Sequence, residues 1–255
     1  AFDAGAVRAT GTLTLGLDGF AEPRFRATTD ELRLTGLPGA LDLELDAAGP
    51  VVAPDPTRLR ADLRLRADGE RLEVRLAEGR ATASLELDDL GRWLEGASGS
   101  AGLRAEAALA PRFLPTTLAI EGRARALAAP IAGGIGLSAL DVSGRLGEDG
   151  AGGLRGELSG LRLPGLPEPL DARLTAQGAA RAPRVELTVS TASIRGTVAG
   201  TADLSGEPRV ELESLALDPG PAGAWEGTFE PPLRLPLTGA PVPDGPLCLD
   251  GPGAP

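Results

Sequence analysis

The chain has 255 residues, 42% of them hydrophobic, which is enough apolar material for one large β domain or two smaller ones. Its net charge of −11, with no run of like positive charge, argues against binding to nucleic acid or to anionic bilayer surfaces. Because the chain has no His and a single cysteine, Cys248, it cannot form an internal disulfide, a Ser-His-Asp or Cys-His nucleophilic site, or the usual zinc ligand sets.

The first residues predict a series of strands. Apolar and polar residues alternate from Val7 to Leu17, and this period of two places alternate side chains on opposite faces of a strand. The returning run from Arg24 to Leu34 changes phase around Thr28–Asp30, which predicts a bulge or a turn there. A third run begins at Leu41. The proline-rich stretch Gly49–Pro56 then predicts a loop or an edge.

The clearest pattern lies between Arg58 and Asp88. Three alternating runs are separated by breaks at Asp68-Gly69 and Glu78-Gly79. A break that contains Gly between two such runs predicts a hairpin, because Gly adopts positive φ without steric cost. The stretch therefore predicts a three-stranded antiparallel meander with one apolar face and one charged face.

The rest of the chain repeats this device, with one interruption and a different C-terminal end. Asp89 can cap one short helix over Leu90–Glu95, and Ala97–Ala101 is interpreted as a flexible connection. Alternating runs separated by turns then continue to Leu217, giving about 15 strands in all. We expect two regions: a β-groove over residues 1–218 and a Pro/Gly-rich cap or C-terminal extension over residues 219–255, which includes a last short strand at Leu233–Leu237.

The composition of the apolar face suggests a trough. Aromatic residues make up only 3% of the chain, so a core built from Leu, Ala and Val would be thin. We therefore expect an all-β fold: a long antiparallel meander that forms a curved, taco-like groove with an apolar interior. Small residues expected on that face leave space beside Leu and Val, and they are Ala81, Ala83, Gly122, Ala124, Gly144 and Gly196.

The apolar face can be covered in three ways: by a second sheet, by a bilayer or by a bound amphiphile. A closed sandwich remains the structural alternative, whereas the shortage of aromatic residues argues against a transmembrane barrel with aromatic girdles. Twenty residues are expected to line the groove if an amphiphile fills it. They are Leu13, Leu15, Leu43, Leu45, Leu63, Leu65, Leu72, Val74, Leu76, Leu85, Leu118, Ile120, Val142, Leu158, Leu174, Val185, Leu187, Val189, Ile194 and Val198.

Catalytic chemistry is not expected. The chain has no Lys and no phosphate-binding loop, and its carboxylates alternate with Arg on the polar faces. Asp88 and Asp89 could hold a hard cation, but a helix cap explains them without one, so we expect no metal and no cofactor. Cys248 is expected to be a buried, inert residue or to pair with a part of the protein outside this chain. Because the sequence contains no Met, we expect it to be a piece of a longer or processed protein.

The recurrent pattern of alternation and Gly-containing turns, seen in GTLTLGLDG, GLSALDVSGRL and SIRGTVAGTADLSG, resembles the AsmA-like superfamily over residues 7–217. That group includes AsmA, TamB and YdbH, and the spacing is most similar to the YdbH-type members. The resemblance implies a periplasmic conduit that carries phospholipid acyl chains between the inner and outer membranes of a Gram-negative bacterium.

The expected partners are phospholipid or another amphiphile, the inner membrane through an anchor that this chain lacks, and an envelope protein at an edge strand. The alternative is a structural, assembly or secretion scaffold of the envelope without lipid, for which type II secretion protein N is a similar β-rich case.

Overall fold

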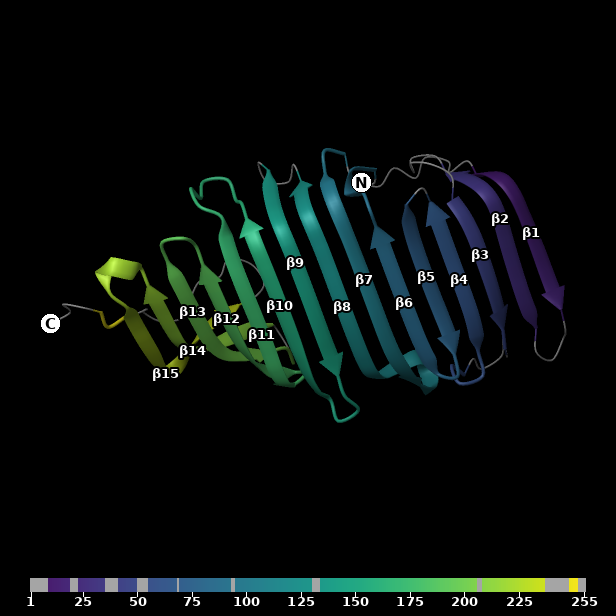
Figure 1. The fold of residues 1–255 in the computed structure, drawn as a ribbon. Coiled ribbons are helices and arrows are strands. Elements are labelled where there is room, and N and C mark those ends of the chain that lie inside the picture. The colour runs from purple at the N-terminus through teal and green to yellow at the C-terminus, as the bar shows by residue number, and fades with distance from the viewer. Residues whose placement is uncertain are drawn as a thin grey trace. The chain divides into compact units, whose positions relative to one another are not determined.

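The fold is one long antiparallel meander of 15 strands that does not close into a barrel (Figure 1). The computed structural model describes residues 9–18, 23–34, 41–49, 55–67, 69–92, 95–129, 134–205, 208–236 and 248–251. Each strand follows its predecessor in the sheet, so the order along the sheet is the order along the chain. The expected all-β meander is therefore confirmed.

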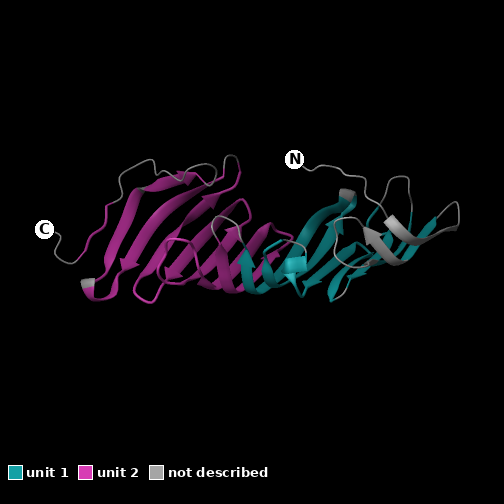
Figure 2. Cartoon of the chain, turned by 90° about the horizontal axis from the view of Figure 1, so that it is seen from above, with its two compact units in different colours: residues 1–130 teal, residues 131–255 magenta. Residues whose placement is uncertain are grey.

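The chain divides into two compact units, residues 1–130 and residues 131–255 (Figure 2). The strands of the first unit are β1 (Ala9–Asp18), β2 (Arg24–Leu34), β3 (Leu41–Ala48), β4 (Arg60–Ala67), β5 (Glu70–Ala77), β6 (Arg80–Leu87), β7 (Ser98–Ala110) and β8 (Leu114–Ala129). The strands of the second unit are β9 (Ile135–Leu146), β10 (Ala151–Leu161), β11 (Leu170–Ala179), β12 (Ala182–Ser190), β13 (Arg195–Asp203), β14 (Arg209–Asp218) and β15 (Trp225–Pro236).

The hairpins of the Arg58–Asp88 stretch form at the expected breaks. β5 and β6 are joined at Glu78 and Gly79, which both have positive φ, 52° and 74°. Two successive positive φ values are typical of the hairpin turns whose twist matches that of the flanking strands. Gly69, in the β4–β5 hairpin, also has positive φ, at 90°. The glycines thus fix the register in which the apolar residues of neighbouring strands meet.

Several strands contain irregularities that bend the sheet. In the β2–β3 pair the register shifts between Thr29 and Leu32, next to the predicted change of phase. In the second unit the register shifts between Leu158 and Leu161, between Ala199 and Gly200, and between Leu212 and Ser214. Because a bulge bends its strand and increases the local twist, these shifts curve the sheet within each unit.

The helix prediction is only partly correct. A single 3-10 turn, η1, spans Leu90–Arg92, and Asp89 Oδ1 accepts the Gly91 N–H at 2.9 Å, as expected of a cap. Trp93 and Leu94, which the prediction also placed in the helix, lie outside the described residues. The interpretation of Ala97–Ala101 as a flexible connection is wrong, because Ser98–Ala101 already belongs to β7 and pairs with β8.

The C-terminal region contributes a full strand. The expected last strand began at Leu233, but β15 begins at Trp225 and pairs with β14 from Leu217 to Arg209. The strand contains Pro231, Pro232 and Pro236, which cannot donate to a ladder, and proline is tolerated at a sheet edge. Short 3-10 turns η2 (Pro111–Phe113) and η4 (Gly220–Ala222) precede β8 and β15.

Among the described residues, the buried side chains of Leu and Phe lie together at one place, whereas the buried alanines occur singly. Leu212, Phe229 and Leu233 form a cluster in which each side chain is at most 8% exposed. Val198, Val210, Leu215 and Leu235 pack against this cluster. The densest packing therefore lies at β13–β15, and most of the sheet has no comparable core among the described residues.

Candidate functional site

Apolar residues line up across the strands of the first unit in continuous rows, which we call rungs. A rung is a row of directly opposed residues that crosses the strands at right angles. Thr29 is the only polar member of the three rungs. The rungs are Leu15–Ala27–Leu45–Leu63–Val74–Ala83–Ala105–Ile120, Leu13–Thr29–Leu43–Leu65–Leu72–Leu85–Leu103–Gly122 and Leu17–Phe25–Ala47–Ala61–Leu76–Ala81–Ala107–Leu118.

The second unit has the same arrangement, and its three rungs consist wholly of apolar residues and glycine. They are Val142–Gly156–Leu174–Leu187–Val198–Leu215–Gly227, Leu140–Leu158–Ala172–Val189–Gly196–Leu217–Trp225 and Gly144–Leu154–Ala176–Val185–Gly200–Leu212–Leu233. The face that carries the rungs of each unit is called the apolar face below. Alternation along every strand places the charged residues on the opposite, charged face.

No described strand covers the apolar face within either unit. All described strands belong to one sheet, in which each strand lies beside the strand next to it in sequence, so no second sheet is present among the described residues. Leu63, Val74 and Leu187 are only half-buried, and Leu103, on β7 near the end of its rung, is 47% exposed. A leucine in a two-layered core would be almost completely buried, so the exposure shows an open apolar surface.

Glycine and alanine leave gaps between the larger side chains of the rungs. At Gly156, between Val142 and Leu174, a Cβ would meet nothing closer than the Leu174 Cβ at 3.8 Å. At Gly196 the nearest atoms would likewise be 3.8 Å away. Such gaps deepen the apolar face locally, where a thin flexible chain can lie. The one polar rung member, Thr29, is satisfied, because its Oγ1 accepts the Leu43 N–H at 3.2 Å.

The structure places most of the predicted lining residues on these rungs. Leu13 and Leu15 stand in register on β1, and only their backbone is described. Ile194 differs from the others: it lies in the turn between β12 and β13, its carbonyl accepts the Thr191 N–H at 2.8 Å, and it is 46% exposed. Every other predicted residue belongs to a strand and to one of the six rungs.

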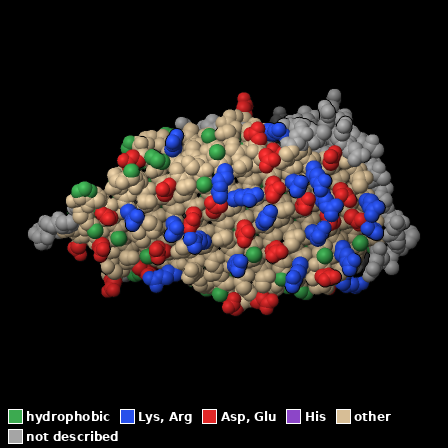
Figure 3. Space-filling view, viewed as in Figure 1, with side chains coloured by type: hydrophobic (Ala, Val, Ile, Leu, Met, Phe, Trp, Pro, Cys, Tyr) green, Lys and Arg blue, Asp and Glu red, His purple; other side chains and the backbone are tan. Residues whose placement is uncertain are grey.

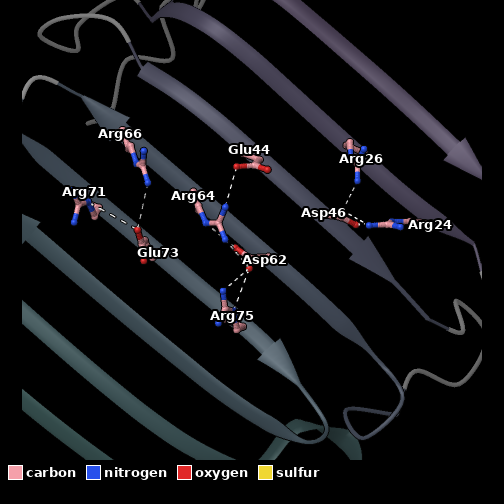
Figure 4. Close-up of polar contacts among 10 residues, drawn as sticks. All are labelled: Arg24, Arg26, Glu44, Asp46, Asp62, Arg64, Arg66, Arg71, Glu73 and Arg75. Atoms are coloured by element: carbon pink, nitrogen blue, oxygen red, sulfur yellow. Dashed lines mark hydrogen bonds and ion pairs between the residues drawn. The ribbon is translucent and has the colours of Figure 1, made fainter.

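The charged face is balanced by ion pairs between strands. Figure 3 shows basic and acidic side chains interspersed on this face, and Figure 4 shows the pairs on β2–β5. Asp62 pairs with Arg75 at 3.0 Å and with Arg64 at 3.2 Å, and Arg64 also reaches Glu44 at 3.1 Å. The Asp62–Arg75 and Arg64–Glu44 contacts join neighbouring strands, so they favour the same register as the rungs do, whereas Asp62 and Arg64 both belong to β4.

Asp46 is the most strongly perturbed acid on that face. Arg24 and Arg26 donate hydrogen bonds to its carboxylate, at 2.6 Å and 2.9 Å to Oδ2. These hydrogen bonds hold the pKa of Asp46 well below its usual range, and the one from Arg24 has the largest effect. In the second unit the hydrogen bond from Arg155 lowers the pKa of Glu157. Both carboxylates are therefore held in the charged form, in which they can pair with Arg and stabilise the sheet.

Two shallow depressions also lie on the charged face of the first unit. One, of about 350 Å³, lies over β6, where the short side chains of Thr82 and Ser84 stand between longer ones on β5 and β7. The other, of about 440 Å³, lies over β3–β5 and includes Asp46 and Asp62. Since Asp46 and Asp62 are already paired with Arg, this surface offers little unbalanced charge to a ligand. The apolar face is therefore the better candidate site.

The sequence interpretation missed the residues that close the apolar face at β15. Trp225, Phe229 and Leu233 were assigned to a cap or extension, but β15 brings Trp225 and Leu233 onto rungs. Leu249 lies close to Gly227 of the same strand. Cys248 is exposed and free, so the expectation that it is buried is wrong.

The described residues contain no group of His, Cys, Asp or Glu side chains that could hold a metal ion. Within the same residues, no helix has the length and hydropathy that crossing a bilayer requires. Comparisons with family models, with curated proteins and with solved structures found no match to this chain.

Proposed function

We propose that this protein is a lipid conduit, in which the apolar face holds phospholipid acyl chains and the charged face remains in water. The continuity of the rungs carries the proposal: apolar residues and glycine succeed one another across the strands of each unit, and outside the β14–β15 cluster most of the larger side chains are only half-buried. An exposed apolar surface of this extent is unfavourable in water unless something apolar covers it. The resemblance to the AsmA-like superfamily supports an acyl chain as that cover.

Acyl chains suit the chemistry of the rungs. Each methylene that leaves water for an apolar surface contributes about 0.8 kcal/mol, without any directional contact. A chain that moves from one strand to the next exchanges Leu and Val contacts for others of the same kind, as from Leu63 to Val74. Movement along the rungs therefore meets no deep well, and the proposed transport is passive, with no catalytic step.

The rest of the proposal follows the same resemblance. The conduit would lie in the periplasm of a Gram-negative bacterium and carry phospholipid between the inner and outer membranes. An anchor in a part of the protein outside this chain would hold it at the inner membrane, and an envelope protein would contact an edge strand. Headgroups would remain at the ends of the strands, where the turns are polar.

Lipid extraction and native mass spectrometry of the purified protein test the proposal. We expect phospholipid to co-purify with the wild type and to be lost in Leu63→Asp, because the new carboxylate would lie in a rung between Leu45 and Val74. The matched control is Thr82→Asp, which places the same charge on the opposite face of β6, beside Arg75. A correctly folded wild type without lipid would instead favour the structural or assembly scaffold.

A further inference from the structure

The C-terminal residues Cys248–Gly251 return to the sheet and pair with β15. The Glu226 N–H donates to the Asp250 carbonyl at 2.9 Å, and the Asp250 N–H donates to the Glu226 carbonyl at 2.8 Å. In an antiparallel pair this reciprocal bonding places Leu249 beside Gly227 and Gly251 beside Trp225. The segment Cys248–Gly251, called the tail below, thus lies along the outer edge of β15.

Leu249 fills a gap at the end of a rung. Gly227 is the last member of the rung that begins at Val142, and its missing side chain leaves space on the apolar face. A Cβ at Gly227 would lie 2.7 Å from the Leu249 Cδ2 and 2.7 Å from the Cys248 carbonyl oxygen. The Leu249 side chain therefore occupies the volume that any larger residue at position 227 would take.

The surroundings of this gap are apolar. The same Cβ position is 3.5 Å from the Phe229 ring, which belongs to the buried cluster with Leu212 and Leu233. A Cβ at Gly251 would overlap the Trp225 indole, so the tail backbone lies against that ring. Two aromatic rings and a glycine thus form a position that accepts one aliphatic group.

We propose that Trp225, Gly227 and Phe229 form an apolar binding position at the last strand, and that Leu249 occupies it in competition with an acyl chain. This inference rests on the proposed lipid-conduit function and adds a specific end point to it. Two backbone hydrogen bonds join the described tail to β15, whereas β14 pairs with β15 along most of its length. An intramolecular segment held this lightly can be displaced by a chain that covers more of the rung.

The sole cysteine makes displacement of the tail measurable. Cys248 is exposed, so a nitroxide attached to it reports whether the tail is held. We expect Gly227→Ala to free the label, seen as a narrower electron paramagnetic resonance spectrum, because the new methyl group collides with Leu249. The matched control Gly156→Ala, whose Cβ meets only ordinary contact at 3.8 Å, should leave the spectrum unchanged. Equal spectra for the wild type and Gly227→Ala would overturn the assigned contact.

Competition with lipid is tested without altering β15. In a Trp93→Phe background, Trp225 is the only tryptophan, and phosphatidylcholine with brominated acyl chains quenches it on contact. Leu249→Ser should raise the apparent affinity for the brominated lipid, by about tenfold if the tail fills the position nine times in ten.

A second reporter separates this inference from the function on which it rests. Leu187→Trp, in a Trp93→Phe, Trp225→Phe background, places the only tryptophan in the middle of the rung that ends at Gly227. Quenching at position 187 without any effect of Leu249→Ser at Trp225 overturns the competition and leaves the conduit intact. Absence of quenching at both positions overturns the conduit itself.

Discussion

Leu63 and Val74 stand directly opposite each other on β4 and β5, and their sequence neighbours Arg64 and Glu73 oppose each other on the other face. This pair of strands therefore carries an apolar rung on one face and oppositely charged residues on the other. Since the side-chain period of a strand is two, a slip of one residue would exchange the two faces. Ion pairs and rungs therefore favour a single register.

Filling a gap in a rung should block lipid without unfolding the protein. A Cβ at Gly156 would meet only ordinary contact with the Leu174 Cβ at 3.8 Å, so Gly156→Phe would place a ring between Val142 and Leu174, across the path of an acyl chain. We expect phospholipid binding, measured by lipid extraction, to fall at least severalfold. Gly153→Phe is the control, because Gly153 lies on the same strand and on the opposite face. Equal loss of lipid in both variants would contradict the assigned path.

The cost of truncating a leucine should depend on its distance from the β14–β15 cluster. Leu212 is 7% exposed and packs in that cluster, so Leu212→Ala should lower the free energy of unfolding by about 2–5 kcal/mol. Leu174 lies half-buried on the open apolar face, and Leu174→Ala should cost about 1–2 kcal/mol. Urea denaturation without added lipid measures both values. A larger loss at Leu174 would indicate a closed core over the rungs.

Backbone conformation predicts opposite effects at Gly79, in a hairpin turn, and at Gly153, within β10. Gly79 has a φ of 74°, so Gly79→Ala should destabilise the protein by about 1–2 kcal/mol. At Gly153 a Cβ would meet only the Ala176 carbonyl oxygen at 3.7 Å, so Gly153→Ala should stabilise by about 0.5–1 kcal/mol. Urea midpoints of the two variants should therefore move in opposite directions, and an unchanged or raised midpoint for Gly79→Ala would disprove the assigned turn.

The ion pairs of Asp46 should make stability depend on pH. Hydrogen bonds from Arg24 and Arg26 lower the folded-state pKa of Asp46, whereas in the unfolded chain its pKa is about 3.9. The stabilising contribution is therefore present above the unfolded-state pKa and is lost as the pH falls toward the folded-state pKa.

Asp46→Asn should consequently lower Tm at neutral pH by a few degrees at most, because the pairs are solvent-exposed. The difference from the wild type should shrink below about pH 4. Thermal unfolding of both proteins across this range measures the effect. A Tm difference between the two proteins that stays constant down to the lowest pH would show that the charge of the Asp46 carboxylate does not contribute to stability.

Much of the fold follows from alternation alone. The runs within Arg58–Asp88 became β4, β5 and β6, because polar and apolar residues alternate in each of them and Gly marks each break. The same logic found Leu187 and Val198, which oppose each other in a rung. Where alternation is strict, the burial pattern and the local backbone preference agree, and sequence is sufficient.

The misses occurred where long-range pairing overrides the local signal. Trp225–Pro236 contains prolines that argue against a strand, yet pairing with β14 holds it in the sheet. Ser98–Ala101 is rich in small residues typical of a linker, but pairing with β8 extends it. The contact between Leu249 and Gly227 has no signal in either segment, since it depends on how the chain returns to the edge of β15.

The most direct test of the account compares two neighbouring residues on β6. Leu85 belongs to a rung and Ser84 to the charged face, and both are half-buried. Benzoylphenylalanine is incorporated at either position, and the purified protein is mixed with phosphatidylethanolamine vesicles and irradiated. The mass of the intact protein is then measured by mass spectrometry. The account predicts a phospholipid adduct at Leu85 and none at Ser84. Equal adducts at both positions, or none at Leu85 in a folded protein, would contradict it.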